Sequence, residues 1–226
     1  MIPVSNAISD FKNSLQPEER FASFDFCYNY FYQSSGKELT DNIERSCYAL
    51  GFYLASWGMM RGSSFLLKKS ARHYIPVIKH IASLDRDIWK IDVDQYTEAN
   101  LQQLVKIYHE IQAILIPEKQ AGLTLITKVM LGVFGFVPAF DQYFCNSFRE
   151  IYGKQCGFRS FNYDALSYIK DFYDKHKSEI DIISNETFTY DFLSGKTTII
   201  KYPKAKVIDM YGFMVGLGKG KFAEVE

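Results

Sequence analysis

The chain has 226 residues and carries 26 lysines and arginines against 26 aspartates and glutamates, so its formal net charge is zero. This balance argues against a protein whose affinity comes mainly from wrapping a nucleic-acid backbone, although it allows a local basic patch. Aromatic residues make up 16% of the chain, which predicts a core filled by large rings. The length suits one compact unit, and we expect a single domain over residues 1–226.

Several classes of protein are excluded by what the sequence lacks. The four cysteines form no C-x-x-C pair, so we expect no disulfide framework. No basic segment with an apolar run opens the chain, and no stretch approaches the roughly 18 apolar residues of a membrane span. We therefore expect a cytoplasmic protein without membrane contact. The four histidines are scattered and no dinucleotide fingerprint is present, so we expect no metal site and no cofactor.

Helical periodicity dominates the first three quarters of the chain. A first helix is predicted to begin at Pro17, with acids beside its positive end, and to end at Gly36. A second is predicted from a cap at Thr40 to about Trp57. Ser64 is expected to cap a short helix, and a further helix begins either at Ser70 with a kink at Pro76 or near Ile75.

The middle of the chain holds one irregular stretch between clear helices. Residues 84–96 partly alternate between apolar and charged, which predicts a short extended segment or loop. Thr97 is expected to start the clearest amphipathic helix, which ends at Pro117. Further helices are predicted over 123–134, around 140–148, and from a cap at Asn162 through Tyr173.

The composition changes after Glu179. Residues 186–202 contain two β-favouring runs around a glycine turn, which predicts a hairpin. A closing helix is expected over 205–215, with Gly216 ending it. The sequence thus predicts a mainly α fold: a single globular helical domain with a small C-terminal β-hairpin.

The first candidate site is the segment 57–64, Trp-Gly-Met-Met-Arg-Gly-Ser-Ser. An arginine between two glycines, followed by two serines, offers a guanidinium, hydroxyls and backbone N–H groups to an anion. Arg61, Ser63 and Ser64 are therefore candidate anion- or phosphate-binding residues. No strand precedes the segment and no Lys-Ser/Thr follows it, so it is not a phosphate loop. The alternative is a helix–turn–helix corner in which Arg61 caps backbone carbonyls.

The second candidate site is the segment 125–144. A helix carrying Lys128 is expected to end at Gly132 or Gly135, and an apolar stretch with a proline then brings Asp141 to the start of the next helix. Helix N–H groups there would keep the carboxylate ionised and oriented. Asp141 and Lys128 are therefore candidate catalytic residues. The alternative is that Asp141 is only a helix cap and Lys128 a solvated or buried-stem lysine.

This order of helix, glycine turn, apolar–proline–apolar stretch, aspartate and aromatic helix resembles the catalytic segment of helix-hairpin-helix DNA glycosylases. The resemblance implies that Asp141 stabilises a developing sugar cation or activates the nucleophile. It also implies that Lys128 corresponds to the lysine that forms a Schiff base in bifunctional members. Lys128 is nearer to the aspartate than the family's lysine, and the family's Leu-Pro-Gly-x-Gly hairpin has no counterpart here, the nearest segment being 116–122.

A second resemblance covers three segments, 54–64, Lys128–Asp141 and 202–211. Together they resemble a family of uncharacterised bacterial proteins, which implies a bacterial or phage setting and no particular activity.

Two functions remain open on the sequence. The first is a nucleic-acid-acting, DNA glycosylase-like protein in which Asp141 acts as electrostatic group or general base, while Lys128 and Arg61 contact phosphate. The second is a non-catalytic helical binding or regulatory protein, as a homodimer or other homo-oligomer, whose aromatic surface receives a partner. Convergence of the side chains of Arg61, Lys128 and Asp141 in one cleft would favour the first function.

Overall fold

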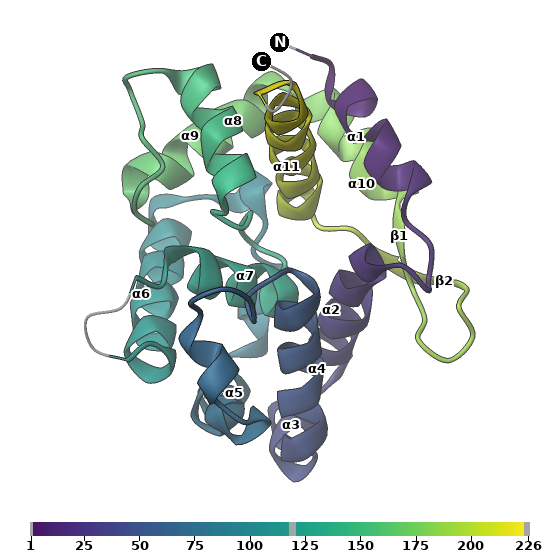
Figure 1. Ribbon diagram of the computed structural model, residues 1–226, viewed down its shortest axis with the longest axis vertical. Coiled ribbons are helices and arrows are strands. Elements are labelled where there is room, and N and C mark those ends of the chain that lie inside the picture. Colours follow the sequence, from purple (N-terminus) through teal and green to yellow (C-terminus); the bar gives the residue numbers. More distant parts are fainter. Residues whose placement is uncertain (1, 118–120, 224–226) are drawn as a thin grey trace.

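The chain forms a mainly helical fold with one short β-hairpin near its C-terminal end, as the sequence predicts (Figure 1). A computed structural model describes residues 2–117 and 121–223. The α-helices are α1 (Val4–Asn13), α2 (Ser23–Gln33), α3 (Gly36–Asp41), α4 (Ile43–Ser56), α5 (Ile75–Ser83), α6 (Glu98–Leu115), α7 (Leu123–Phe134), α8 (Gln142–Tyr152), α9 (Tyr163–Lys175), α10 (Lys177–Glu186) and α11 (Lys204–Ala223). Short 3₁₀ helices span η1 (Arg20–Ala22), η2 (Phe65–Lys68), η3 (Ala71–Tyr74), η4 (Arg86–Lys90) and η5 (Val93–Gln95).

Three helices, α1, α10 and the short α3, are not among the predicted elements. Helix α1 buries Val4, Ile8 and Phe11, and α10 buries Ile180 and Ile183. The apolar residues are spaced by four and three in α1 and by three in α10, so each of these two helices lays one apolar stripe on the core. Helices α1 and α10 both pack against α11 and cover part of its surface.

The first predicted helix is wrong at both ends. It begins at Ser23 rather than Pro17, and Gly36 opens α3 instead of ending α2. Ser35 caps α3 through a capping box with Glu38, whose side chain accepts from the Ser35 backbone. Gly36 is required because a Cβ there would lie 2.2 Å from the carbonyl oxygen of Ala82.

The expected cap at Thr40 is also wrong, because Thr40 lies inside α3. The 84–96 region is not extended but folds into η4 and η5. The other predicted helix starts are confirmed: a 3₁₀ helix capped by Ser64, α5 beginning at Ile75, α6 capped by Thr97, α7 at Leu123, α8 capped by Asp141 and α9 capped by Asn162.

Helix α7 is the central element of the fold. Every residue from Leu125 to Phe134 is buried, and the helix packs against α2, α4 and α6 (Figure 1). Gly132 admits the ring of Tyr53, which a Cβ would meet at 2.3 Å. Gly135 then ends the helix in the left-handed conformation with φ 75°. This burial on all sides fixes the position of the one charged side chain that α7 carries, Lys128.

Helix α11 continues beyond the predicted end at Val215 to Ala223. The glycines of α11 lie inside the helix and do not end it. Two of them leave the space in which α8 approaches α11 closely. A Cβ at Gly212 would lie 2.4 Å from the ring of Phe144, and one at Gly216 would lie 2.2 Å from the carbonyl oxygen of Tyr143. The close α8–α11 contact places the first turn of α8 against the middle of α11.

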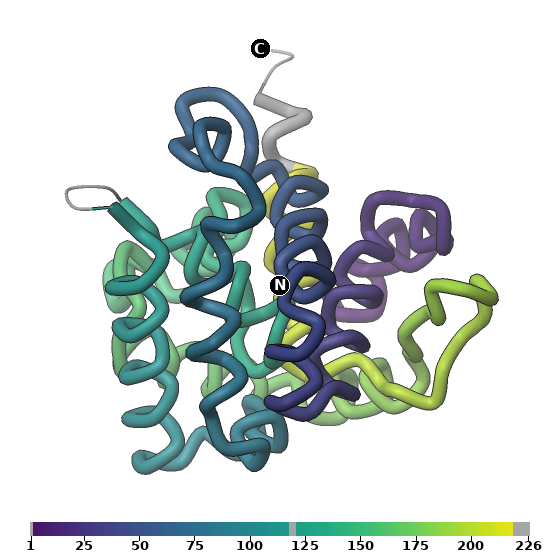
Figure 2. Tube along the Cα trace, turned by 90° about the horizontal axis from the view of Figure 1, so that it is seen from below, coloured from purple at the N-terminus to yellow at the C-terminus, as the bar shows by residue number. Residues whose placement is uncertain are grey.

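The structure confirms the predicted C-terminal β-hairpin. Strand β1 (Phe188–Tyr190) pairs antiparallel with β2 (Thr197–Lys201), with an irregularity in register between the two paired positions. The turn between the strands lies at the edge of the molecule (Figure 2), where the ring of Phe192 packs edge to face against that of Phe26 in α2. A two-stranded hairpin is marginal by itself, so its contacts with the helical body maintain it.

A buried aspartate of α2 holds the hairpin to the body. Asp25 accepts hydrogen bonds from the backbone N–H of Tyr190 at 2.9 Å and from the hydroxyl of Tyr202 at 2.5 Å. Burial raises the pKa of Asp25 to about 7, although both hydrogen bonds and nearby Lys206 favour its charged form.

A second aspartate, the half-buried Asp92, caps α11 from a distant part of the chain. Asp92 accepts hydrogen bonds from the backbone N–H groups of Val93 at 2.7 Å, Lys204 at 2.7 Å and Ala205 at 3.0 Å. Burial raises the pKa of Asp92 to about 6. The start of α11 is therefore fixed by a side chain more than a hundred residues earlier in the sequence.

The four cysteines are free and buried, as expected for small apolar side chains. In residues 2–117 and 121–223, no helix is both long enough and apolar enough to cross a membrane.

Candidate functional site

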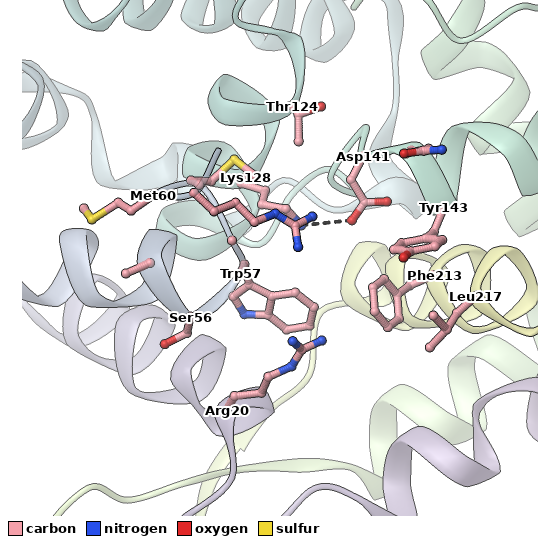
Figure 3. Close-up of a pocket in the computed structure, with 15 residues that line it drawn as sticks. Arg20, Ser56, Trp57, Met60, Thr124, Lys128, Asp141, Tyr143, Phe213 and Leu217 are labelled. Atoms are coloured by element: carbon pink, nitrogen blue, oxygen red, sulfur yellow. Dashed lines mark hydrogen bonds and ion pairs between the residues drawn. The ribbon is translucent and has the colours of Figure 1, made fainter. Parts of the chain in front are cut away.

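A cavity of about 600 Å³, which we call the Trp57 pocket, opens where several helices meet (Figure 3). Its volume lies in the range of small-molecule sites, roughly 300–1,000 Å³. Its lining comes from η1 (Arg20), the end of α4 and the following turn (55–61), α7 (Thr124, Lys128), the start of α8 (141–143) and α11 (Phe213, Leu217). Three sequence-predicted side chains, those of Arg61, Lys128 and Asp141, therefore lie in one pocket.

The Lys128–Asp141 ion pair forms one wall. Oδ1 of Asp141 accepts from the backbone N–H of Phe144 at 3.0 Å, so Asp141 is the cap of α8. Its Oδ2 lies 3.0 Å from Nζ of Lys128 (Figure 3), and the two side chains are only 14% and 4% exposed. Asp141 is thus both a cap and a pocket residue. The two interpretations drawn from the sequence do not exclude each other.

The chemistry of this pair follows from its geometry. Both carboxylate oxygens of Asp141 have a donor, which holds the group in one orientation. An ammonium group bound to a carboxylate has no lone pair with which to attack a sugar carbon. In this arrangement Lys128 and Asp141 supply two fixed, mutually compensating charges rather than a nucleophile.

The indole of Trp57 is surrounded by cationic groups. Nζ of Lys128 lies 4.9 Å, Nζ of Lys206 lies 4.8 Å and Cζ of Arg20 lies 5.9 Å from its ring. Lys206 does not line the pocket; it is 1% exposed and pairs with Asp209 at 2.8 Å. These cation–π contacts hold the indole in place at the pocket wall.

Aromatic side chains of α8 and α11 lie opposite Trp57 in Figure 3. The rings of Trp57 and Phe213 are 5.7 Å apart, and those of Phe213 and Tyr143 are 5.3 Å apart, both edge to face. Leu217 adds an apolar side chain on the same side. Because aromatic rings pack well against flat apolar groups, this wall suits a planar ring of a ligand.

Two arginines of the pocket, Arg20 and Arg61, have no acidic partner in residues 2–117 and 121–223. Among the described residues, neither Arg20 nor Arg61 forms an ion pair, in contrast to Lys128. The guanidinium of Arg20 lies over the rings of Phe21 and Trp57. That of Arg61 folds back onto Gly58, where a Cβ would lie 3.0 Å from its Nε. Guanidinium groups in such a position are suited to bind phosphate or carboxylate oxygens.

The two serines predicted to act with Arg61 lie elsewhere. Ser63 and Ser64 line a neighbouring cavity of about 360 Å³ beside the start of α7. The hydroxyl of Ser64 donates to the carbonyl of Met59 at 2.6 Å and caps the backbone N–H of Leu66. The hydrogen bonds of Ser64 are thus made within the turn, and neither serine lines the Trp57 pocket with Arg61.

No protein-family model, curated protein or solved structure matches this chain. The resemblances to helix-hairpin-helix glycosylases and to uncharacterised bacterial proteins therefore stay predictions, and the function is inferred from the pocket itself.

Several pocket residues carry no sequence signal that could single them out. Arg20, Tyr143 and Phe213 come from different elements, and only the packing of these elements brings them together. Trp57 lies in the segment singled out for its arginine, but the sequence offers no reason to assign it a role. The pocket as a whole can bind an anion beside a planar apolar group.

Proposed function

We propose that the protein binds a nucleotide unit in the Trp57 pocket, with the phosphate at Arg20 and Arg61 and the base against the aromatic wall. One observation carries this proposal: two arginines that form no ion pair with any described residue line the same cavity as Trp57, Tyr143 and Phe213.

The charges of the pocket support an anionic ligand. Over the whole chain positive and negative charges balance, and the buried lysines near the pocket each have a carboxylate partner. The arginines do not, so a ligand that supplies phosphate oxygens would complete their hydrogen bonds. Arginine is the side chain best matched to the geometry of phosphate.

The aromatic wall supports a base as the second part of the ligand. Stacking of a base on an aromatic side chain contributes about 1–3 kcal/mol. The bases of an intact duplex are stacked inside the helix, so a base can enter a pocket only as a free or unstacked unit. The neutral overall charge agrees with this, because binding one unit needs few phosphate contacts.

Replacement of either arginine by glutamine tests the proposal. We expect Arg20→Gln and Arg61→Gln each to weaken binding of nucleoside 5′-monophosphates by about 10- to 100-fold, because each loses a charge-assisted hydrogen bond worth about 1.5–3 kcal/mol. Titration calorimetry measures the affinity, and the fluorescence of Trp57 at the pocket wall offers an independent signal.

Arg45→Gln is the matched control for both variants. Arg45 lies on α4 about 15 Å along the helix from Ala55, and its guanidinium contacts the ring of Tyr30. Its replacement should leave nucleotide affinity unchanged. If the wild-type protein binds no nucleoside monophosphate at millimolar concentration, or if Arg45→Gln weakens binding as much as the pocket variants, the proposal is wrong.

A second candidate function is cleavage of the base from the bound nucleotide. The observation that favours it is the placement of the oriented Asp141 carboxylate on the pocket wall. In such a reaction water adds to the anomeric carbon, the carbon–nitrogen bond breaks, and the base leaves with a proton. The carboxylate would stabilise the positive charge that develops on the sugar.

Asp141→Asn tests this second candidate. Asparagine keeps the cap to Phe144, because its amide oxygen still accepts the hydrogen bond. We expect the rate of base release, measured by chromatography, to fall by on the order of 100-fold or more when the charge is removed. Absence of base release by the wild-type protein would exclude cleavage while leaving nucleotide binding intact.

A further inference from the structure

We infer that the ligand presents a phosphate monoester, a dianion near neutral pH, rather than the internal phosphodiester of a nucleic-acid strand. The inference rests on the proposed nucleotide binding and specifies the charge of the ligand. It is carried by the number of uncompensated charges in the Trp57 pocket.

The charged groups that line the pocket among the described residues are Arg20, Arg61, Lys128 and Asp141. Lys128 and Asp141 compensate each other at 3.0 Å, and both are nearly buried. Lys206, the further ammonium near Trp57, is compensated by Asp209. Two positive charges therefore remain, one on each arginine.

A ligand with two negative charges matches this number. A phosphate monoester carries about −1.5 to −2 at pH 7, because its second pKa is about 6. An internal phosphodiester carries one negative charge and would leave one guanidinium without a counter-charge. The attraction between the ligand and the two guanidinium groups is therefore weaker when the ligand carries one negative charge in place of two.

The number of phosphate oxygens leads to the same conclusion. The two guanidinium groups are held separately, that of Arg20 over the rings of Phe21 and Trp57 and that of Arg61 against Gly58. Each offers a planar fork of donors. A monoester has three terminal oxygens to accept from two forks, whereas a diester has two non-bridging oxygens and a second substituent that takes up the remaining position.

The test compares two probes that differ only in the esterification of the phosphate. These are a nucleoside 5′-monophosphate and its methyl ester, which is a diester with one charge. We expect the wild-type protein to bind the monoester about 10- to 100-fold more tightly, the effect of one charge-assisted contact. In Arg61→Gln, which keeps one uncompensated charge, this preference should shrink several-fold.

Acidification provides a second, independent comparison. Between pH 7.5 and 5 the monoester takes up a proton and the methyl ester does not. The affinity for the monoester should therefore fall towards that of the methyl ester. Because Asp25 and Asp92 of the protein titrate in the same window, the methyl ester serves as the reference at every pH.

Two outcomes separate this inference from the function on which it rests. If both esters bind equally well, the monoester inference is wrong and nucleotide binding stands. If neither binds, nucleotide binding itself is wrong. A 5′-phosphorylated tetranucleotide that binds as well as the mononucleotide supports a strand end as the source of the monoester. Binding of the mononucleotide alone supports a free nucleotide.

Discussion

Lys206→Met is expected to lower the free energy of unfolding by about 3–5 kcal/mol, because it leaves the buried carboxylate of Asp209 without its counter-charge. Lys206 is 1% exposed and lies 2.8 Å from Asp209. For a protein of this length the melting temperature should fall by roughly 10 °C. Urea unfolding and calorimetry measure both quantities.

The double variant Lys206→Met/Asp209→Asn shows whether the unpaired charge is the cause. Oδ1 of Asp209 accepts from the backbone N–H of Ala139 at 3.0 Å, and asparagine keeps this bond without a charge. We expect the double variant to regain most of the lost stability. Lys204→Met is the control, since Lys204 pairs with the more exposed Asp94 and should cost at most about 1 kcal/mol. Equal losses in all three variants would contradict this explanation.

The Lys206–Asp209 ion pair also affects the Trp57 pocket. Lys206 contacts the rings of Phe24 and Trp57 at 4.8 Å each, so it supports the wall against which the proposed base packs. The compensation of its charge by Asp209 is what leaves the two arginines as the net positive charge available to a ligand. A neutral chain can therefore hold an anion-binding pocket because its buried lysines are neutralised locally.

The parts of the fold that were predictable are those fixed by local signals. Thr97, Asp141 and Asn162 each precede an amphipathic run and cap it in the structure, and the glycine turn with its flanking β-favouring runs marks the hairpin. A cap acts over a few residues, so the sequence around it suffices to identify it.

The errors occur where tertiary contacts decide. Gly36 and Gly216 look like helix ends, but each provides space for a neighbouring backbone carbonyl, that of Ala82 and that of Tyr143 respectively. The segment 84–96, predicted as extended or as a loop, folds into 3₁₀ turns, and Asp92 in it caps a helix that begins at Lys204. No local pattern contains this information, since the partners are distant in sequence.

In the candidate site, too, some residues were predictable from local sequence and others only from tertiary packing. Arg61, Lys128 and Asp141 were identifiable as chemically capable residues within two short segments, and the fold brings them to one pocket. Arg20 and Phe213 belong to the same pocket through packing alone. Charge compensation is likewise a tertiary property: the sequence shows equal numbers of charges, whereas only the structure shows which ones remain unpaired.

Asp25→Asn is expected to change how stability depends on pH. The pKa of Asp25 is about 7 in the folded protein because the carboxyl is buried, and it is near 3.8 when the chain unfolds. Between these values the folded state holds a proton that the unfolded state has lost, so this group's contribution to stability is present at low pH and is lost as pH rises towards 7. Unfolding free energies of both proteins in urea, measured at several pH values from 4 to 8, test this.

Asparagine has no such proton, so the stability of the variant relative to the wild type should rise with pH, by up to about 4 kcal/mol between pH 4 and 8. The contribution of Asp92 is common to both proteins and cancels in the difference. Asp191→Asn is the matched control on the hairpin, because hydrogen bonds from Ser194 lower the pKa of Asp191; its relative stability should be flat above pH 5. Parallel curves for Asp25→Asn and the wild type would show that the buried carboxyl does not hold its proton near neutral pH.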